Sequence, residues 1–286
     1  SVAPGTDFYQ YACGGWMKNN PLKPEYARFG SFDAVAENNR EQIRTLIEEL
    51  SENDNEKGSV AQKIGDLYSM MMDSVRQNRE GAQPIMGDLE AIEGLEGRQA
   101  ILSYLNRQQL YGGSHLISCG IGADMMSSTA NMVEIGQGGL TLGNKDYYVK
   151  DDAAMQRIRD AFRKHIVNMF RLVGDDEPTA RRKMESVMRL EHRMAVASRS
   201  RVELRDPQAN YNKMSFADLK RDYQGFDWDE YFSAQLIDGL DSLSVGQPEA
   251  VREAVAILGN TPERELKDWI EWKLLNRSGS VLGGEI

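Results

Sequence analysis

Three histidines, His115, His165 and His192, are the first residues to consider for metal or acid–base chemistry in this sequence. A catalytic zinc site usually takes three protein ligands, and two of them are often histidines one helical turn apart, as in HExxH. No pair among the three has that spacing. The GxSxG, GxxxxGKS and GxGxxG patterns are absent as well. We therefore interpret each histidine as a partly buried structural residue, and the motif search alone finds no active site.

The other reactive side chains and the overall charge exclude several classes of protein. Cys13 and Cys119 are too few for a disulfide framework and form no CxxC pair. The net charge of −10 would repel a phosphate backbone, so we expect no nucleic-acid binding. No apolar run approaches the roughly 18 residues that span a bilayer. No signal peptide is visible at the start, as would also be true of a mature exported protein.

Apolar residues recur at helical spacing along most of the chain, so the fold class should be mainly α. We expect helices at 32–50, 61–79, 85–93, 97–109, 151–173, 178–198, 215–224, 228–237, 247–258 and 261–276. Met70, Met71 and Met72 in the second of these are interpreted as core filler. Two short apolar runs, 115–121 and 129–135, flank a turn-like ADMMSS and predict one small β-hairpin. Prolines and glycines punctuate residues 1–31, which we expect to form an irregular N-terminal arm.

Four motifs, in the same order along the chain, resemble the neprilysin family of zinc metallopeptidases (peptidase family M13, which includes the bacterial PepO enzymes). The longest is DFYQYACGGWMKNNPLKPEYARFGSFD, from Asp7 to Asp33. NKDYYVKDD at 144–152, LRDPQANYNKMSFADL at 204–219 and DWIEWKLLN at 268–276 are similar to later segments of the family. The resemblance therefore covers nearly the whole chain.

The resemblance implies a multi-helix lobe of the neprilysin-like fold. It also implies that different regions of the parent protein have different roles. Residues 1–31 would pack on a catalytic domain that this chain does not contain, and residues 32–286 would form the non-catalytic lobe that encloses the substrate. In the family, the zinc motifs HExxH and ExxxD follow the WxLLN helix at a distance. The terminal VLGGEI superficially echoes the family's VIGHEI, with Gly284 in place of the histidine, but the spacing from Trp272 argues against that register. We expect a zinc-dependent endopeptidase as the parent and an inactive fragment here, with no metal in this chain.

The resemblance also implies residues that contact the substrate. Arg28 matches an arginine that binds near a peptide C-terminus, Phe32 matches a phenylalanine of the adjacent apolar pocket, and Asp33 matches an aspartate that would orient Arg28. A guanidinium can bind a carboxylate through two hydrogen bonds. Where the family has a second arginine, this chain has Ala36. From the residues alone, Arg28 is equally a solvated loop arginine, Phe32 a hydrophobic staple and Asp33 a first-turn helix acid.

The same resemblance assigns Cys13 to a disulfide with a cysteine of the catalytic domain, which would leave it a free thiol here. A Cys13–Cys119 bond and a small buried hydrophobe are the alternatives. The implied partners are peptide substrates and the C-terminal catalytic domain, and the implied location is extracytoplasmic, in a bacterial periplasm or at the cell surface, with a signal or lipid anchor outside this chain. The alternative function is a non-enzymatic helical binding module that has lost the catalytic half. The reading frame after Ile286 would distinguish the two functions.

Overall fold

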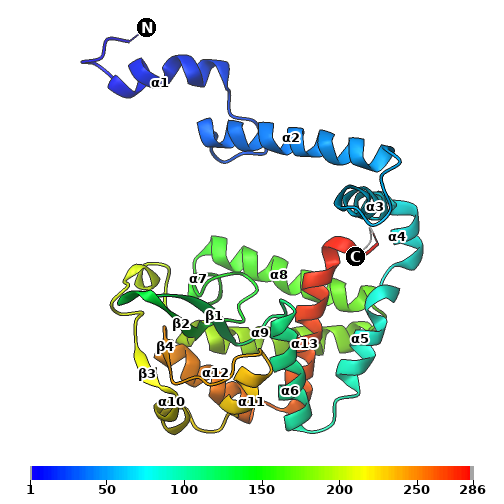
Figure 1. Cartoon of the computed structure of the whole chain (residues 1–286), viewed down its shortest axis with the longest axis vertical. Coiled ribbons are helices and arrows are strands. Elements are labelled where there is room, and N and C mark those ends of the chain that lie inside the picture. The colour runs from blue at the N-terminus through cyan, green and yellow to red at the C-terminus, as the bar shows by residue number, and fades with distance from the viewer. Residues whose placement is uncertain (1, 284–286) are drawn as a thin grey trace. The chain divides into compact units, whose positions relative to one another are not determined.

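The computed structural model describes residues 2–283 and divides the chain into two compact units, residues 1–74 and 75–286 (Figure 1). The apparent VIGHEI match at Gly284 lies outside the described residues. Both units are dominated by helices, and one small sheet lies in the second unit, which confirms the mainly α fold class. None of the described helices is long and apolar enough to cross a bilayer.

The first unit begins with helix α1, Phe8–Asn19, so the prediction of an irregular arm through residue 31 is wrong at this point. Asp7 caps the helix, because its carboxylate accepts a hydrogen bond from the Gln10 N–H at 2.8 Å. Gly14 and Gly15 lie inside the helix and do not break it. Glycine lowers helix stability by only about 1 kcal/mol per residue, and a capped helix tolerates that cost.

Helices α2, Ser31–Glu52, and α3, Val60–Met72, complete the first unit. They cross closely at Gly65, where an added Cβ would lie 2.5 Å from the Leu50 carbonyl oxygen. The helix expected at 61–79 is interrupted at Asp73 and continues as α4, Ser74–Glu80. Met70, Met71 and Met72 are exposed, so their interpretation as core filler is wrong for this chain.

The second unit contains the remaining helices, most of which lie where the apolar periodicity predicted them. Their bounds are α5 Gln83–Glu93, α6 Arg98–Leu110, α7 Asp146–Val149, α8 Ala153–Leu172, α9 Glu177–Ala197, α10 Phe216–Asp222, α11 Trp228–Ser233, α12 Pro248–Asn260 and α13 Glu263–Ser278. Short 3-10 turns lie at Glu203–Arg205 and Gly279–Val281. Trp228, Trp269 and Trp272 are fully buried in the core of this unit.

The sheet of the second unit has four strands in the order β1-β2-β4-β3 (Figure 1). Strands β1, Ile117–Asp124, and β2, Ser127–Gln137, form the predicted antiparallel hairpin. Strands β4, Ser242–Val245, and β3, Lys213–Ser215, were not predicted. β4 pairs parallel with β2, and β3 pairs antiparallel with β4. The first strand, β1, therefore lies at one edge of the sheet.

A buried carboxylate joins several elements of the second unit. Glu191 on α9 is fully buried and accepts hydrogen bonds from Tyr148, Trp269 and the Thr141 backbone and hydroxyl. Lys273 on α13 completes the cluster, with its Nζ 3.0 Å from a Glu191 oxygen. Burial lowers the pKa of Lys273, although the Glu191 carboxylate opposes this. The cluster ties α7, α9, α13 and the loop around Thr141 together.

Candidate functional site

The segment that carries the strongest resemblance is held in shape by three aromatic rings. Phe29 stacks on Trp16 of α1 with ring centroids 6.1 Å apart, and the Tyr26 ring meets Phe29 edge-on at 5.2 Å. Lys23 lies over the Phe29 ring at 5.8 Å. Aromatic pairs at these separations stabilise a fold beyond the area that they bury. The loop between α1 and α2 is thus packed on its own aromatic residues, with Phe29 turned inward.

The predicted substrate residues Arg28 and Phe32 project from this segment toward solvent. Phe32 is 91% exposed, which argues against the hydrophobic staple in this chain. Arg28 is exposed as well. The two side chains are therefore available to a ligand or to another part of a larger protein.

Asp33 has a role in the turn itself. Its carboxylate accepts a hydrogen bond from the N–H of Gly30, the N-cap residue of α2, at 2.8 Å. This is the N3 half of a capping box, because glycine has no side chain to accept the reciprocal bond. Within residues 2–283, no ion pair or hydrogen bond joins Asp33 to Arg28. Asp33 fixes the start of α2, and through it the position of Phe32 one residue earlier.

A groove beside the same turn contains a polar triad that the sequence did not indicate. The Glu37 carboxylate accepts hydrogen bonds from the Tyr26 hydroxyl at 2.8 Å and from Lys23 Nζ at 3.0 Å. The hydrogen bond from Tyr26, followed by that from Lys23, lowers the pKa of Glu37. Phe29 and Arg40 also line this groove. Arg28, Phe32 and Asp33 are not among its lining residues, so the groove and the predicted contact residues are separate features.

The three histidines do not form a zinc site. His115 is buried, accepts a hydrogen bond from the Ile117 N–H at 2.9 Å, and lies 3.1 Å from the Asn106 side-chain oxygen. Burial lowers its pKa to about 3. His165 and His192 are exposed, which corrects their interpretation as partly buried residues. Among residues 2–283, no group of three or more histidine, cysteine or carboxylate side chains could hold a metal ion. Zinc therefore does not fit the described part of this chain.

Both cysteines are free thiols in this structure. Cys119 lies on β1, and burial raises its pKa to about 11, which keeps the thiol protonated and unreactive at neutral pH. Cys13 lies in α1 and is half-buried. The alternative of a Cys13–Cys119 disulfide is not what the structure contains.

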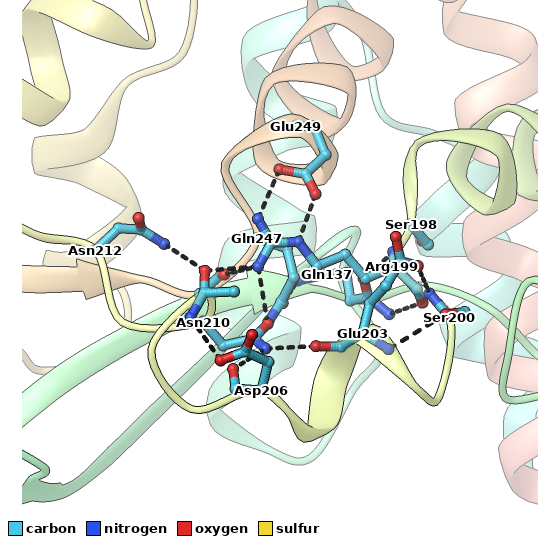
Figure 2. Close-up of polar contacts among 12 residues, drawn as sticks. Gln137, Ser198, Arg199, Ser200, Glu203, Asp206, Asn210, Asn212, Gln247 and Glu249 are labelled. Carbon is cyan, nitrogen blue, oxygen red and sulfur yellow. Dashed lines mark hydrogen bonds and ion pairs between the residues drawn. The ribbon is translucent and has the colours of Figure 1, made fainter.

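Arg199 organises the loop that precedes and includes the LRDPQANYN motif (Figure 2). Its guanidinium forms a bidentate pair with Glu249 at the start of α12, at 2.5 and 3.1 Å. A third nitrogen donates to the carbonyl oxygens of Ala209 and Gly246 at 2.7 and 3.2 Å. The hydrogen bond from Arg199 lowers the pKa of Glu249. Because these donors are engaged by the chain itself, Arg199 positions the loop and is not free to bind a ligand.

Amide side chains extend this network to the sheet (Figure 2). Gln137 at the end of β2 pairs with the Arg199 backbone, accepting from its N–H at 2.7 Å and donating to its carbonyl oxygen at 3.2 Å. Gln247 donates to Asn210 at 2.8 Å and accepts from the Gln137 N–H at 2.9 Å. Sequence analysis singled out this segment as a motif but did not identify these contacts, because the partners lie up to 110 residues apart.

Comparison with known proteins identifies relatives over nearly the whole chain. Residues 4–286 match the family described as Peptidase family M13. Endothelin-converting enzyme 1 of Rattus norvegicus is 26% identical over 99% of this chain. The Mycobacterium tuberculosis zinc metalloprotease ZMP1, in complex with an inhibitor, superimposes with a TM-score of 0.88 at 26% identity over 99% of this chain. PepO from Lactobacillus rhamnosis HN001 shares the fold, with a TM-score of 0.77 at 17% identity over 99% of this chain. This chain spans 38% of the length of the rat enzyme, 43% of ZMP1 and 45% of PepO.

Proposed function

Since this chain belongs to peptidase family M13, we propose that it is the N-terminal, substrate-enclosing lobe of a zinc-dependent endopeptidase that hydrolyses peptides. In this proposal, the zinc ion and the residues that activate water belong to the remainder of the parent protein. The residues of this chain enclose and position the peptide. The chain by itself is inactive.

The observation that carries the proposal is the absence of a closed core in the first unit. Between residues 2 and 74, only Gly65 is buried. Large apolar side chains along α1 and α2 are exposed instead: Phe8, Tyr9, Tyr11, Phe32, Val35, Ile43 and Leu46. Exposed apolar side chains in this number are typical of a surface that binds another protein region. We infer that this surface, which we call the α1–α2 apolar surface, packs on the catalytic domain of the parent.

The proposed partner follows from the length of the relatives. This chain spans less than half of the length of the relatives named above, and we propose that the remainder of a parent protein of that length supplies the partner of the α1–α2 apolar surface. The proposed docking region includes residues 1–31 and extends into α2. Cys13 on α1 would then lie where a disulfide could join the two domains, as the resemblance implies.

Within this docked arrangement, Arg28 and Phe32 are proposed to contact the substrate on the primed side of the cleaved bond. Their exposure and their position on a capped, aromatic-packed turn support the proposal. Asp33 contributes by fixing that turn. We also propose an extracytoplasmic location for the parent, on the basis of the resemblance alone.

The experiment compares the parent protein with this chain. The parent should contain an HExxH motif, bind zinc stoichiometrically and cleave an internally quenched peptide, with activity lost on chelation and restored by zinc. The purified 286-residue chain should neither bind zinc tightly nor cleave the peptide. Zinc-dependent cleavage by the chain alone would contradict the assignment, and a parent without any HExxH motif would favour a non-enzymatic binding module.

A further inference from the structure

Strand β1 leaves its outer edge without a partner. It is the outermost strand of the sheet, and residues 120–123 are exposed. The Ile117 N–H donates to the His115 ring, and the Ile117 carbonyl oxygen accepts from Gln109 and Tyr231, so both of its backbone groups point away from β2. Backbone direction alternates along a strand. The N–H and C=O groups of Cys119, Ile121 and Ala123 therefore point to the free edge.

Hydrogen bonding on the other side of the hairpin supports this assignment. The Ile135 carbonyl oxygen accepts from the Gly246 N–H at 2.8 Å, so the odd-numbered residues of β2 face β4. The even-numbered residues then face β1, where Gly120 pairs with Glu134. Within residues 2–283, the edge groups of Cys119, Ile121 and Ala123 have no hydrogen-bond partner.

This edge lacks two of the features that usually protect an exposed strand, although the β1–β2 register shifts between Ala123 and Asp124. The sequence of β1, ISCGIGAD, contains no proline, lysine or arginine. One face of the strand is nearly bare, because it carries Ser118, Gly120 and Gly122. No atom lies within 4 Å of the position that a Cβ of either glycine would occupy. An added strand would find room there for its own side chains.

The face of β1 that carries Ser118, Gly120 and Gly122, which we call the glycine face, also lies beside a carboxylate that has no counter-charge within residues 2–283. Beside Gly122, a small pocket is lined by Met132, Glu134 and Tyr211, together with Asp124. Asp124 is neutralised by Lys213 at 3.0 Å and accepts from the Tyr211 hydroxyl at 2.8 Å. In the described part of the chain, the exposed Glu134 has neither an ion pair nor a hydrogen-bond partner. The pocket therefore has one carboxylate available for a cation.

We propose that the free edge of β1 binds an extended peptide as an additional strand, with a lysine or arginine side chain that crosses the glycine face to Glu134. The added strand would lie two strand spacings, about 10 Å, from β2, which carries Glu134. A lysine or arginine side chain of the peptide and the Glu134 side chain are together long enough to bridge that distance. This inference rests on the proposed function, since it treats the bound peptide as a substrate. A second copy of the chain fits less well, because β1 itself carries no basic residue to pair with Glu134.

Binding of a fluorescein-labelled peptide to the 286-residue chain tests the proposal by fluorescence anisotropy. The probe has about seven alternating valine and threonine residues with a central lysine. Ile121→Pro removes an N–H that faces the free edge and leaves the β1–β2 bonds in place, because proline is tolerated on an edge strand. We expect binding to weaken roughly ten-fold in Ile121→Pro. The matched control, Ile121→Val, should bind the probe as the wild type does.

Two further binding experiments use the wild-type chain with N-methylated probes and the conservative variant Glu134→Gln. In a strand pairing, only alternate amides of the peptide face β1, so N-methylation of one alternate set should abolish binding and methylation of the other should not. Glu134→Gln should weaken binding of the lysine probe about three-fold and should leave binding of a norleucine probe unchanged.

Several outcomes would overturn the proposal. The proposal is wrong if the wild-type chain does not bind the probe, or if both N-methylated probes bind equally well. It is also wrong if Glu134→Gln weakens binding of the lysine probe and of the norleucine probe by the same factor. A wild-type dimer in sedimentation that Ile121→Pro converts to monomer would assign the edge to a second copy instead. Zinc-dependent hydrolysis by the parent does not depend on these results, so this proposal and the proposed function can fail separately.

Discussion

Arg28 and Phe32 illustrate how a short motif can separate packing residues from contact residues. Phe29 packs on Trp16, while its neighbours in the sequence remain exposed on a turn that Asp33 closes. The resemblance named Arg28 and Phe32, and the structure leaves both available. Their role in binding substrate stays a prediction.

In the parent enzyme, Arg28→Gln should raise KM about ten-fold for a peptide with a free C-terminal carboxylate. The reason is the loss of a charge-assisted hydrogen bond to that carboxylate. A C-terminally amidated peptide should show little change, and KM for the two peptides measures the difference. Arg44→Gln, on an α2 residue paired with Glu41 and Glu48, is the control. Equal effects of Arg28→Gln on both peptides would contradict the assignment.

His115 should make the stability of the second unit depend on pH. Its folded-state pKa of about 3 lies below the usual value of 6.5, so between these values the unfolded state binds a proton that the folded state does not. Stability should therefore fall as pH falls below 6.5, by about 1.4 kcal/mol per pH unit from this group. Urea unfolding at pH 5, 6 and 7.5 measures the slope. His115→Gln should flatten it, whatever its stability at pH 7.5, and an unchanged slope would rule out His115 as the cause.

The residues that organise the second unit could not be identified from the sequence. Glu191 looked like any helix carboxylate next to a histidine, because its partners Thr141, Tyr148 and Lys273 lie far away along the chain. Nothing in the local sequence around Arg199 indicated its contacts, apart from its position shortly before the LRDPQANYN motif. Local patterns contain no information about which distant side chains meet in a core.

At the scale of elements, helices with strong apolar periodicity were predicted well and short elements were not. The ranges 85–93 and 97–109 match α5 and α6 within two residues. The strands β3 and β4 have only three and four residues, and their pairing depends on non-local contacts. Helix α1 was missed because its glycine pair suggested a loop, while the cap at Asp7 was overlooked.

The contact between α9 and α13 gives a test at this scale. Glu191→Gln should destabilise the chain by about 3–5 kcal/mol, because it leaves the buried Lys273 ammonium without its counter-charge. The double change Glu191→Gln with Lys273→Met should be less destabilising than the single change. Arg193→Gln, also on α9, removes a surface pair with Glu253 of α12 and should lower the free energy of unfolding by less than about 1 kcal/mol. Urea unfolding measures the free energy of unfolding of the three variants. A similar loss of that free energy in Glu191→Gln and in Arg193→Gln would contradict the role of the buried pair.

At the scale of the whole molecule, the two units differ in how completely they bury their apolar side chains. The second unit has an extensive core that includes three tryptophans. The first unit, between residues 2 and 74, buries no apolar side chain. The sequence predicted helices 32–50 and 61–79 from apolar stripes, but a stripe indicates that a helix needs a partner without showing where that partner is. We propose that the partner lies in the remainder of the parent protein.

Amide hydrogen exchange, compared between the 286-residue chain and the parent protein, tests this claim most directly. Burial of the α1–α2 apolar surface against the catalytic domain should suppress local opening, so amides of residues 8–50 should exchange at least about ten-fold more slowly in the parent. Amides of α6, which carries the buried Ile101 and Leu105, are the internal control and should exchange alike in both proteins. Equal exchange of residues 8–50 in the chain and the parent would contradict the account.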